Sequence, residues 1–261
     1  MNREKFLIVF WAVVRAILFF AVVMGVSMGF VMLNADQSPD VIWFPVPVIG
    51  VLAGAIIWAQ RRWDIGLAHP AGMPWGRVYA VGAAVTVLGL TVCILQGAYY
   101  GFVRETEIIA DNVSSIFAMT YAFVMSVVAA ILAEATFRGV LQTRIQAALG
   151  VWPTVIVVGI INTLAHRWGP ELAQNWLGLF VIMSGWTYLR WLSQSLVPPV
   201  VLHGLVNLLL AAALWAYGPL DHAVLGIGAL TTVALVGLAS LAVAIILSRG
   251  IDRPRSAISY A

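Results

Sequence analysis

The sequence predicts an all-α polytopic membrane protein with about eight transmembrane helices and both termini in the cytoplasm. Of the 261 residues, 62% are hydrophobic and only 10% are charged, and the mean hydropathy is +0.98. A soluble domain carries roughly 25% charged residues, so this much apolar surface requires lipid. The same figures exclude disordered and collagen-like chains, and the single cysteine excludes an internal disulfide scaffold.

The spacing of apolar segments supports this fold class. A spanning helix needs about 20 mostly apolar residues. Eight segments qualify: 6–33, 41–59, 78–101, 115–141, 151–166, 172–190, 198–217 and 222–248. The first exceeds the core of about 7–15 apolar residues of a signal peptide, so we expect a retained helix. Turn-forming residues separate the segments: 34–40, Pro70–Pro74, Gly150 with Pro153, Gly169-Pro170, Pro198-Pro199 and Gly218-Pro219. We therefore expect a single transmembrane domain, residues 1–261.

The placement of basic residues fixes the expected orientation. They occur at the N-terminus, in every second loop and at the C-terminus: Arg3, Lys5, Arg61, Arg62, Arg77, Arg144, Arg190, Arg249, Arg253 and Arg255. The positive-inside rule then places both termini in the cytoplasm. No basic run is long enough to indicate binding of nucleic acid. Tyr188 and Arg190 are read as interfacial anchors.

The segment from about 115 to 149 is longer than one crossing requires. Its last part is amphipathic, with Arg138, Gln142, Arg144 and Gln146 on the polar side. We expect this part to run out into, or along, the cytoplasmic interface.

Six polar residues within the apolar segments form pairs four residues apart on one helix face. The pairs are Glu134 with Arg138, Asn162 with His166, and His203 with Asn207. Polar groups in lipid are costly, which makes each a candidate site residue. Glu134 and His166 each lie 16 residues from Gly150, so with a rise of about 1.5 Å per residue they reach the same level. His203 follows Pro198 by five residues, about 8 Å. The three helices are predicted to surround one polar pocket that opens toward the cytoplasm.

A carboxylate and two histidines in a dry pocket suit the activation of water, with neighbouring donors to hold an amide oxyanion. Other interpretations stay open. Glu134 and Arg138 can form an ion pair that merely makes both tolerable in lipid, and His203 with Asn207 can connect helices by hydrogen bonds. His166 can be an interfacial histidine without a task. Metal binding by Glu134, His166 and His203 is a further alternative, although the sequence has no His-Glu-x-x-His motif.

These pairs lie in stretches that resemble the motifs of the CPBP family, the CAAX proteases and bacteriocin-processing enzymes also called Abi. Residues 133–139, Ala-Glu-Ala-Thr-Phe-Arg-Gly, resemble Glu-Glu-x-x-x-Arg-Gly. Residues 162–166 resemble Phe-x-x-x-His, and residues 203–207 match His-x-x-x-Asn. The similar core covers about residues 115–215.

The resemblance implies an intramembrane glutamic endopeptidase that uses no metal or other cofactor. In the family, the first Glu and the middle His activate water, and the last His and Asn stabilise the oxyanion. Carried over, the middle His is His166, the oxyanion pair is His203 and Asn207, and the structural Arg is Arg138. The implied partners are the lipid bilayer and a membrane-associated peptide or protein substrate, in a bacterial inner membrane.

Two positions depart from the family pattern: the first Glu is Ala133 and the Phe is Asn162. Three explanations are open: a non-catalytic fold that binds or assembles another membrane protein, a carboxylate re-sited to Glu134 or Glu171, or an engineered change at Ala133. We expect peptide hydrolysis, with Glu134 as the surviving carboxylate and His166 beside it. Asn162, one turn before His166, is expected to hydrogen-bond that ring and set its tautomer or orientation.

Overall fold

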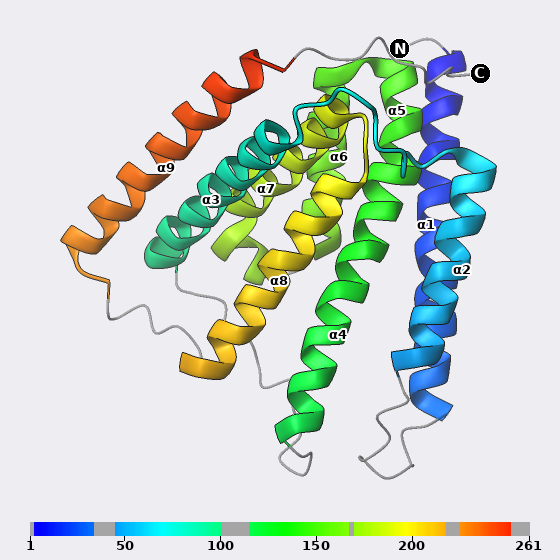
Figure 1. Ribbon diagram of the computed structural model, residues 1–261, viewed down its shortest axis with the longest axis horizontal. Helices are drawn as coiled ribbons and strands as arrows, with labels where there is room; N and C mark the ends of the chain where they lie inside the picture. The colour runs from blue at the N-terminus through cyan, green and yellow to red at the C-terminus, as the bar shows by residue number, and fades with distance from the viewer. Residues whose placement is uncertain (1–2, 34–44, 101–114, 167–169, 218–224, 252–261) are drawn as a thin grey trace.

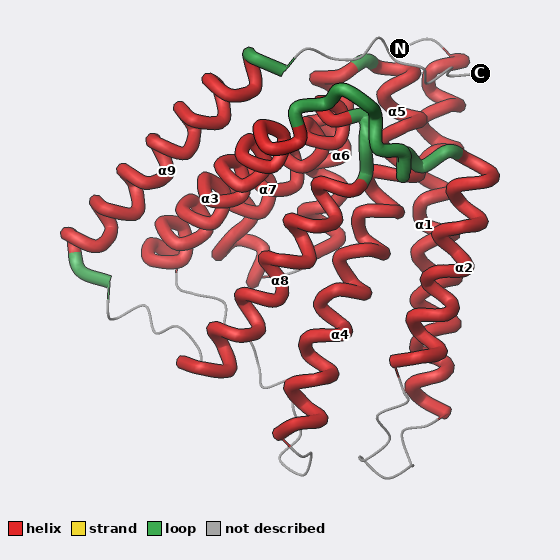
Figure 2. Tube along the Cα trace, in the orientation of Figure 1, coloured by secondary structure: helices red, strands yellow, loops and turns green. Residues whose placement is uncertain are grey.

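The computed structural model describes residues 3–33, 45–100, 115–166, 170–217 and 225–251. These ranges contain helices and short connections and no strand (Figures 1 and 2), which confirms the all-α fold. The helices are α1 Arg3–Leu33, α2 Pro45–Trp63, α3 Trp75–Tyr100, α4 Ser115–Glu134, the π-helix η1 Ala135–Leu141, α5 Gln142–Leu149, α6 Val151–His166, α7 Pro170–Ser193, α8 Val197–Tyr217 and α9 Ile227–Arg249. Because α4, η1 and α5 follow one another without a break, the described ranges hold eight helical rods.

Helix length and composition identify the chain as an integral membrane protein. Within the described ranges, four stretches are long and apolar enough to cross a membrane: Arg3–Ser27, Trp75–Tyr100, Val124–Leu149 and Ile227–Arg249. Two further apolar helical stretches are shorter, Val151–His166 and Val197–Ala213. Large apolar side chains on α1 and α9 face outward, among them Leu18, Val22 and Leu238. Such outward-facing apolar surfaces are stable in contact with lipid.

One face of α1 forms part of the first apolar cluster. Its buried residues Ala12, Ala16, Phe19 and Val23 recur at intervals of four, three and four, which places them on one side of a 3.6-residue helix. They pack with residues of α2, α4, η1 and α5. This cluster also includes apolar residues along the whole π-helix.

The second apolar cluster is centred on α7, which packs between α3 and α6. Close approach of α3 and α7 depends on Gly178. A Cβ atom there would lie 2.5 Å from the backbone nitrogen and 2.8 Å from the Cα of Cys93. The backbone of α3 therefore occupies the space that any side chain at position 178 would need.

Basic residues gather at one end of the described bundle. In Figure 1 the start of α1, the turn between α5 and α6 and the end of α9 lie at the same end. The last turns of α2 and α9 carry Arg61, Arg62 and Arg249 and also lie there. The positive-inside rule predicts that this end faces the cytoplasm.

The connection between α7 and α8 differs from the sequence prediction. Ser193, Ser195 and Leu196 are buried, and the Leu196 amide donates to the Gly66 carbonyl at 2.7 Å. The segment after α2 thus covers this turn, so α8 begins inside the bundle. The depth of His203 in the membrane, counted from this turn, stays a prediction.

We expect Gly178→Ala to lower the free energy of unfolding by about 1–3 kcal/mol, as overpacking does. The matched control is Gly54→Ala on α2, where a Cβ atom would meet nothing within 4 Å. This change should be neutral or stabilise by up to about 1 kcal/mol through helix propensity. Unfolding in detergent, followed by circular dichroism, measures both. Equal effects at the two positions would contradict close packing of α3 on α7.

Candidate active site

The centre of the site is the carboxylate of Glu134, the last residue of α4, which is fully buried. Its Oε1 accepts a hydrogen bond from Arg138 Nη1 at 2.9 Å and lies 2.8 Å from His203 Nδ1. An ionised carboxylate can only accept, so His203 Nδ1 carries the proton of this second bond. One oxygen of Glu134 therefore connects η1 with α8.

Arg138 compensates the charge of Glu134 inside the bundle. Its guanidinium is fully buried, and Nη2 donates to the Met183 carbonyl at 2.9 Å, with Met183 Sδ at 3.3 Å. The guanidinium carbon also lies 5.7 Å from the centroid of the Trp186 ring. A buried ion pair survives only with such additional hydrogen bonds, and here they come from α7.

The π-helix η1 aims Arg138 inward. All seven of its residues are buried, and π-helical turns often occur at functional sites. A Cβ atom on Gly139 would lie 2.9 Å from Ile65 Cβ. The absence of a side chain at position 139 therefore lets Ile65, in the segment after α2, pack against η1. Gln142, at the start of α5, donates to the Thr187 carbonyl at 2.8 Å. Arg138 and Gln142 therefore face α7, which supplies their hydrogen-bond partners, while the course of this segment along the membrane interface stays a prediction.

His203 is fixed on its other side by an aromatic ring. The Trp186 and His203 ring centroids are 4.7 Å apart, and Trp186 Nε1 donates to Thr86 Oγ1 at 2.9 Å. The His166 ring, at the end of α6, has its centroid 5.9 Å from that of His203. The structure therefore brings Glu134, His166 and His203 into one cluster from three different helices.

Asn162 joins Arg138 to His166. Its side chain is fully buried, and one amide orientation satisfies both neighbours. In that orientation the oxygen accepts from Arg138, with Nη2 at 3.0 Å, and the nitrogen lies 3.1 Å from His166 Nδ1. Asn162 is thus a member of the hydrogen-bonded network around Glu134.

Asn207 and Ala133 lie at the edge of this network. The Asn207 amide nitrogen donates to the Ser126 carbonyl at 3.1 Å and so connects α8 with α4. Ala133 is 7% exposed and packs in the first apolar cluster. The side chain of Glu171, the other carboxylate considered from the sequence, lies outside the described residues.

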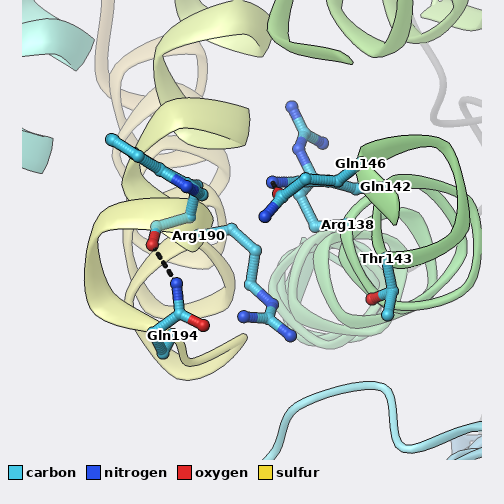
Figure 3. A pocket seen from close by; sticks show the side chains of 7 residues that line it. Arg138, Gln142, Thr143, Gln146, Arg190 and Gln194 are labelled. Atoms are coloured by element: carbon cyan, nitrogen blue, oxygen red, sulfur yellow. Dashed lines mark hydrogen bonds between the residues drawn. The ribbon is translucent and has the colours of Figure 1, made fainter. Parts of the chain in front are cut away.

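Sequence reasoning missed the contribution of α7. Arg190 is only 4% exposed and its Nη2 lies 3.5 Å from the Ile65 carbonyl oxygen, while its role as an interfacial anchor stays a prediction. It lines an open pocket (Figure 3) together with Arg138, Gln142, Thr143, Gln146, Trp191 and Gln194. A guanidinium and several amides within apolar helices were the available signal for this pocket. Trp186 and Met183 gave no sequence signal of a site role, since both are ordinary apolar residues of a membrane helix.

The cluster is held by hydrogen bonds among its own members. Among the described residues, no group of three His, Cys, Asp or Glu side chains is arranged to hold a metal ion. The donors that surround Glu134 fit a carboxylate that works as a base or as a structural anion.

We expect Arg138→Met to destabilise the protein by about 3–5 kcal/mol, because it leaves the Glu134 carboxylate buried without its cation. Arg144→Met is the matched control, since Arg144 lies on the same helical rod but is only partly buried. Unfolding in detergent should show a much smaller change for it. Equal losses for the two variants would contradict the structural role of the Arg138 ion pair.

Comparison with known proteins agrees with the motifs. Residues 115–209 match the family of type II CAAX prenyl endopeptidases described as Rce1-like. The matched range holds Glu134, Arg138, His166, His203 and Asn207. Searches of curated proteins and of solved structures gave no match. The resemblance to the CPBP family is thereby confirmed over residues 115–209, as an Rce1-like match.

Proposed function

We propose that this protein is an intramembrane peptidase that cleaves a membrane-associated polypeptide, in a bacterial inner membrane. The Rce1-like match supports this class of activity. The single observation that carries the proposal is the state of the Glu134 carboxylate. Its Oε1 is held by Arg138 and His203, while no described residue donates a hydrogen bond to its buried Oε2.

Oε2 of Glu134 is the proposed base. A buried oxygen without a protein donor suits a water molecule. As the water oxygen attacks the carbonyl carbon of the peptide, one water proton passes to Oε2. When the C–N bond breaks, the same proton passes to the leaving amide nitrogen, which departs as an amine. The other product is a carboxylic acid.

His203 and Asn207 are the proposed stabilisers of the oxyanion. His203 already donates from Nδ1 to Glu134, so it can donate from Nε2 only as an imidazolium, whose charge the developing oxyanion would balance. The amide nitrogen of Asn207 has two hydrogens, and one of them goes to Ser126. The second hydrogen is the one that we assign to the oxyanion.

A second candidate function is that of a non-catalytic binding or assembly factor for another membrane protein. The observation that favours it is Ala133, which packs among apolar side chains where the family motif has its first Glu. In this case Glu134, Arg138 and His203 form a structural network only. Partner binding would then be independent of a base at position 134.

We expect Glu134→Gln to lower kcat by at least about 10²-fold, the lower range for loss of a general base. The measurement uses purified protein in liposomes with a library of membrane-anchored peptides, and mass spectrometry identifies the products. Thr136→Val is the control, because Thr136 is buried on the same rod and its hydroxyl donates only to the Leu132 carbonyl at 2.8 Å. This variant should retain wild-type cleavage.

Unchanged cleavage by Glu134→Gln would contradict the proposed base. Absence of cleavage by the wild type, together with a stoichiometric membrane-protein partner that co-purifies with both wild type and Glu134→Gln, would favour the binding factor instead.

A further inference from the structure

We propose that Asn162 is a positioning residue that keeps the proton of the neutral His166 ring on Nε2, so that His166 donates a hydrogen bond and does not act as the base. The role toward a peptide rests on the proposed peptidase function. The tautomer itself follows from three groups that the structure places in contact: Arg138, Asn162 and His166.

Arg138 determines which way the amide of Asn162 faces. A guanidinium has only donors, so the neighbouring amide must present its oxygen to it. That oxygen accepts from Arg138, with Nη2 at 3.0 Å. The reverse orientation would place the NH₂ group of Asn162 against the N–H groups of Arg138. Because Asn162 is fully buried, water cannot relieve such a contact.

The oriented amide then determines the proton position on His166. The nitrogen of Asn162 can only donate, and it lies 3.1 Å from His166 Nδ1. Nδ1 must therefore be the unprotonated nitrogen of the neutral ring, and Nε2 carries the hydrogen.

A competing partner favours the other tautomer. His166 Nδ1 also lies 3.0 Å from the backbone carbonyl oxygen of Asn162. A proton on Nδ1 would satisfy that carbonyl but would oppose the amide N–H. The side chain and the main chain of one residue thus favour opposite tautomers, and Arg138 decides between them through the amide.

This coupling gives Glu134 and His166 different roles. A neutral His166 with its hydrogen on Nε2 has no lone pair there to remove a proton from water, which leaves that step to Glu134. Its Nε2–H group is suited to a developing negative oxygen on the peptide. The Phe of the CPBP motif has no hydrogen-bonding side chain and makes neither bond, so the coupling is a property of this chain.

The test reads the tautomer directly and without substrate. The protein is labelled with ¹⁵N-histidine, reconstituted in lipid nanodiscs and studied by solid-state NMR at neutral pH, and His166→Gln assigns the His166 signals by their loss. We expect a protonated Nε2 and a bare Nδ1 in the wild type. Asn162→Leu and the closer isostere Asn162→Asp should each move a proton onto Nδ1, toward the carbonyl of residue 162 or the new carboxylate.

Thr163→Val is the matched control, because the neighbouring Thr163 is buried on the same helix and donates only to the Gly159 carbonyl at 2.8 Å. It should leave the wild-type tautomer unchanged. A protonated Nδ1 in the wild type would overturn the proposal. So would a bare Nδ1 that persists in a folded Asn162→Leu or Asn162→Asp variant. Because no peptide is present, these outcomes are independent of whether the protein cleaves one.

Discussion

The burial of one carboxylate organises this part of the molecule. A charge placed among apolar helices is strongly unfavourable unless a counter-charge and further hydrogen bonds accompany it. For Glu134 the counter-charge is Arg138 and the further donor is His203. Arg138 in turn needs acceptors, which Met183 and Asn162 provide. Satisfying one anion therefore fixes η1, α6, α7 and α8 relative to one another.

The irregular features of the fold lie around the hydrogen-bonded network of Glu134. The π-helix turns Arg138 and Gln142 toward α7, and Gly139 leaves room for Ile65 to cover it. The turn before α8 is buried, and α8 brings His203 against Glu134 and His166. Outside these features the helices expose apolar side chains, as lipid requires.

The spans and the polar pairs were predictable from sequence because polar groups inside lipid are costly and therefore rare. Glu134, Arg138, His166 and His203 stand out in apolar segments for this reason. The π-helix was not predictable, since the order of residues 135–141 fits a regular helix equally well. The buried turn and the contacts of Trp186 depend on packing between distant segments, which periodicity does not encode. For the same reason the sequence could place Asn162 one turn from His166 but could not show its contact with Arg138.

The central claim is that Glu134 and His203 interact directly across two helices inside the bundle. A double-mutant cycle with Glu134→Met and His203→Leu, measured as free energies of unfolding in detergent, tests this most directly. We expect the two changes to be coupled by at least about 1 kcal/mol, as residues in one network are. Additivity within about 0.5 kcal/mol, the behaviour of distant independent sites, would contradict it.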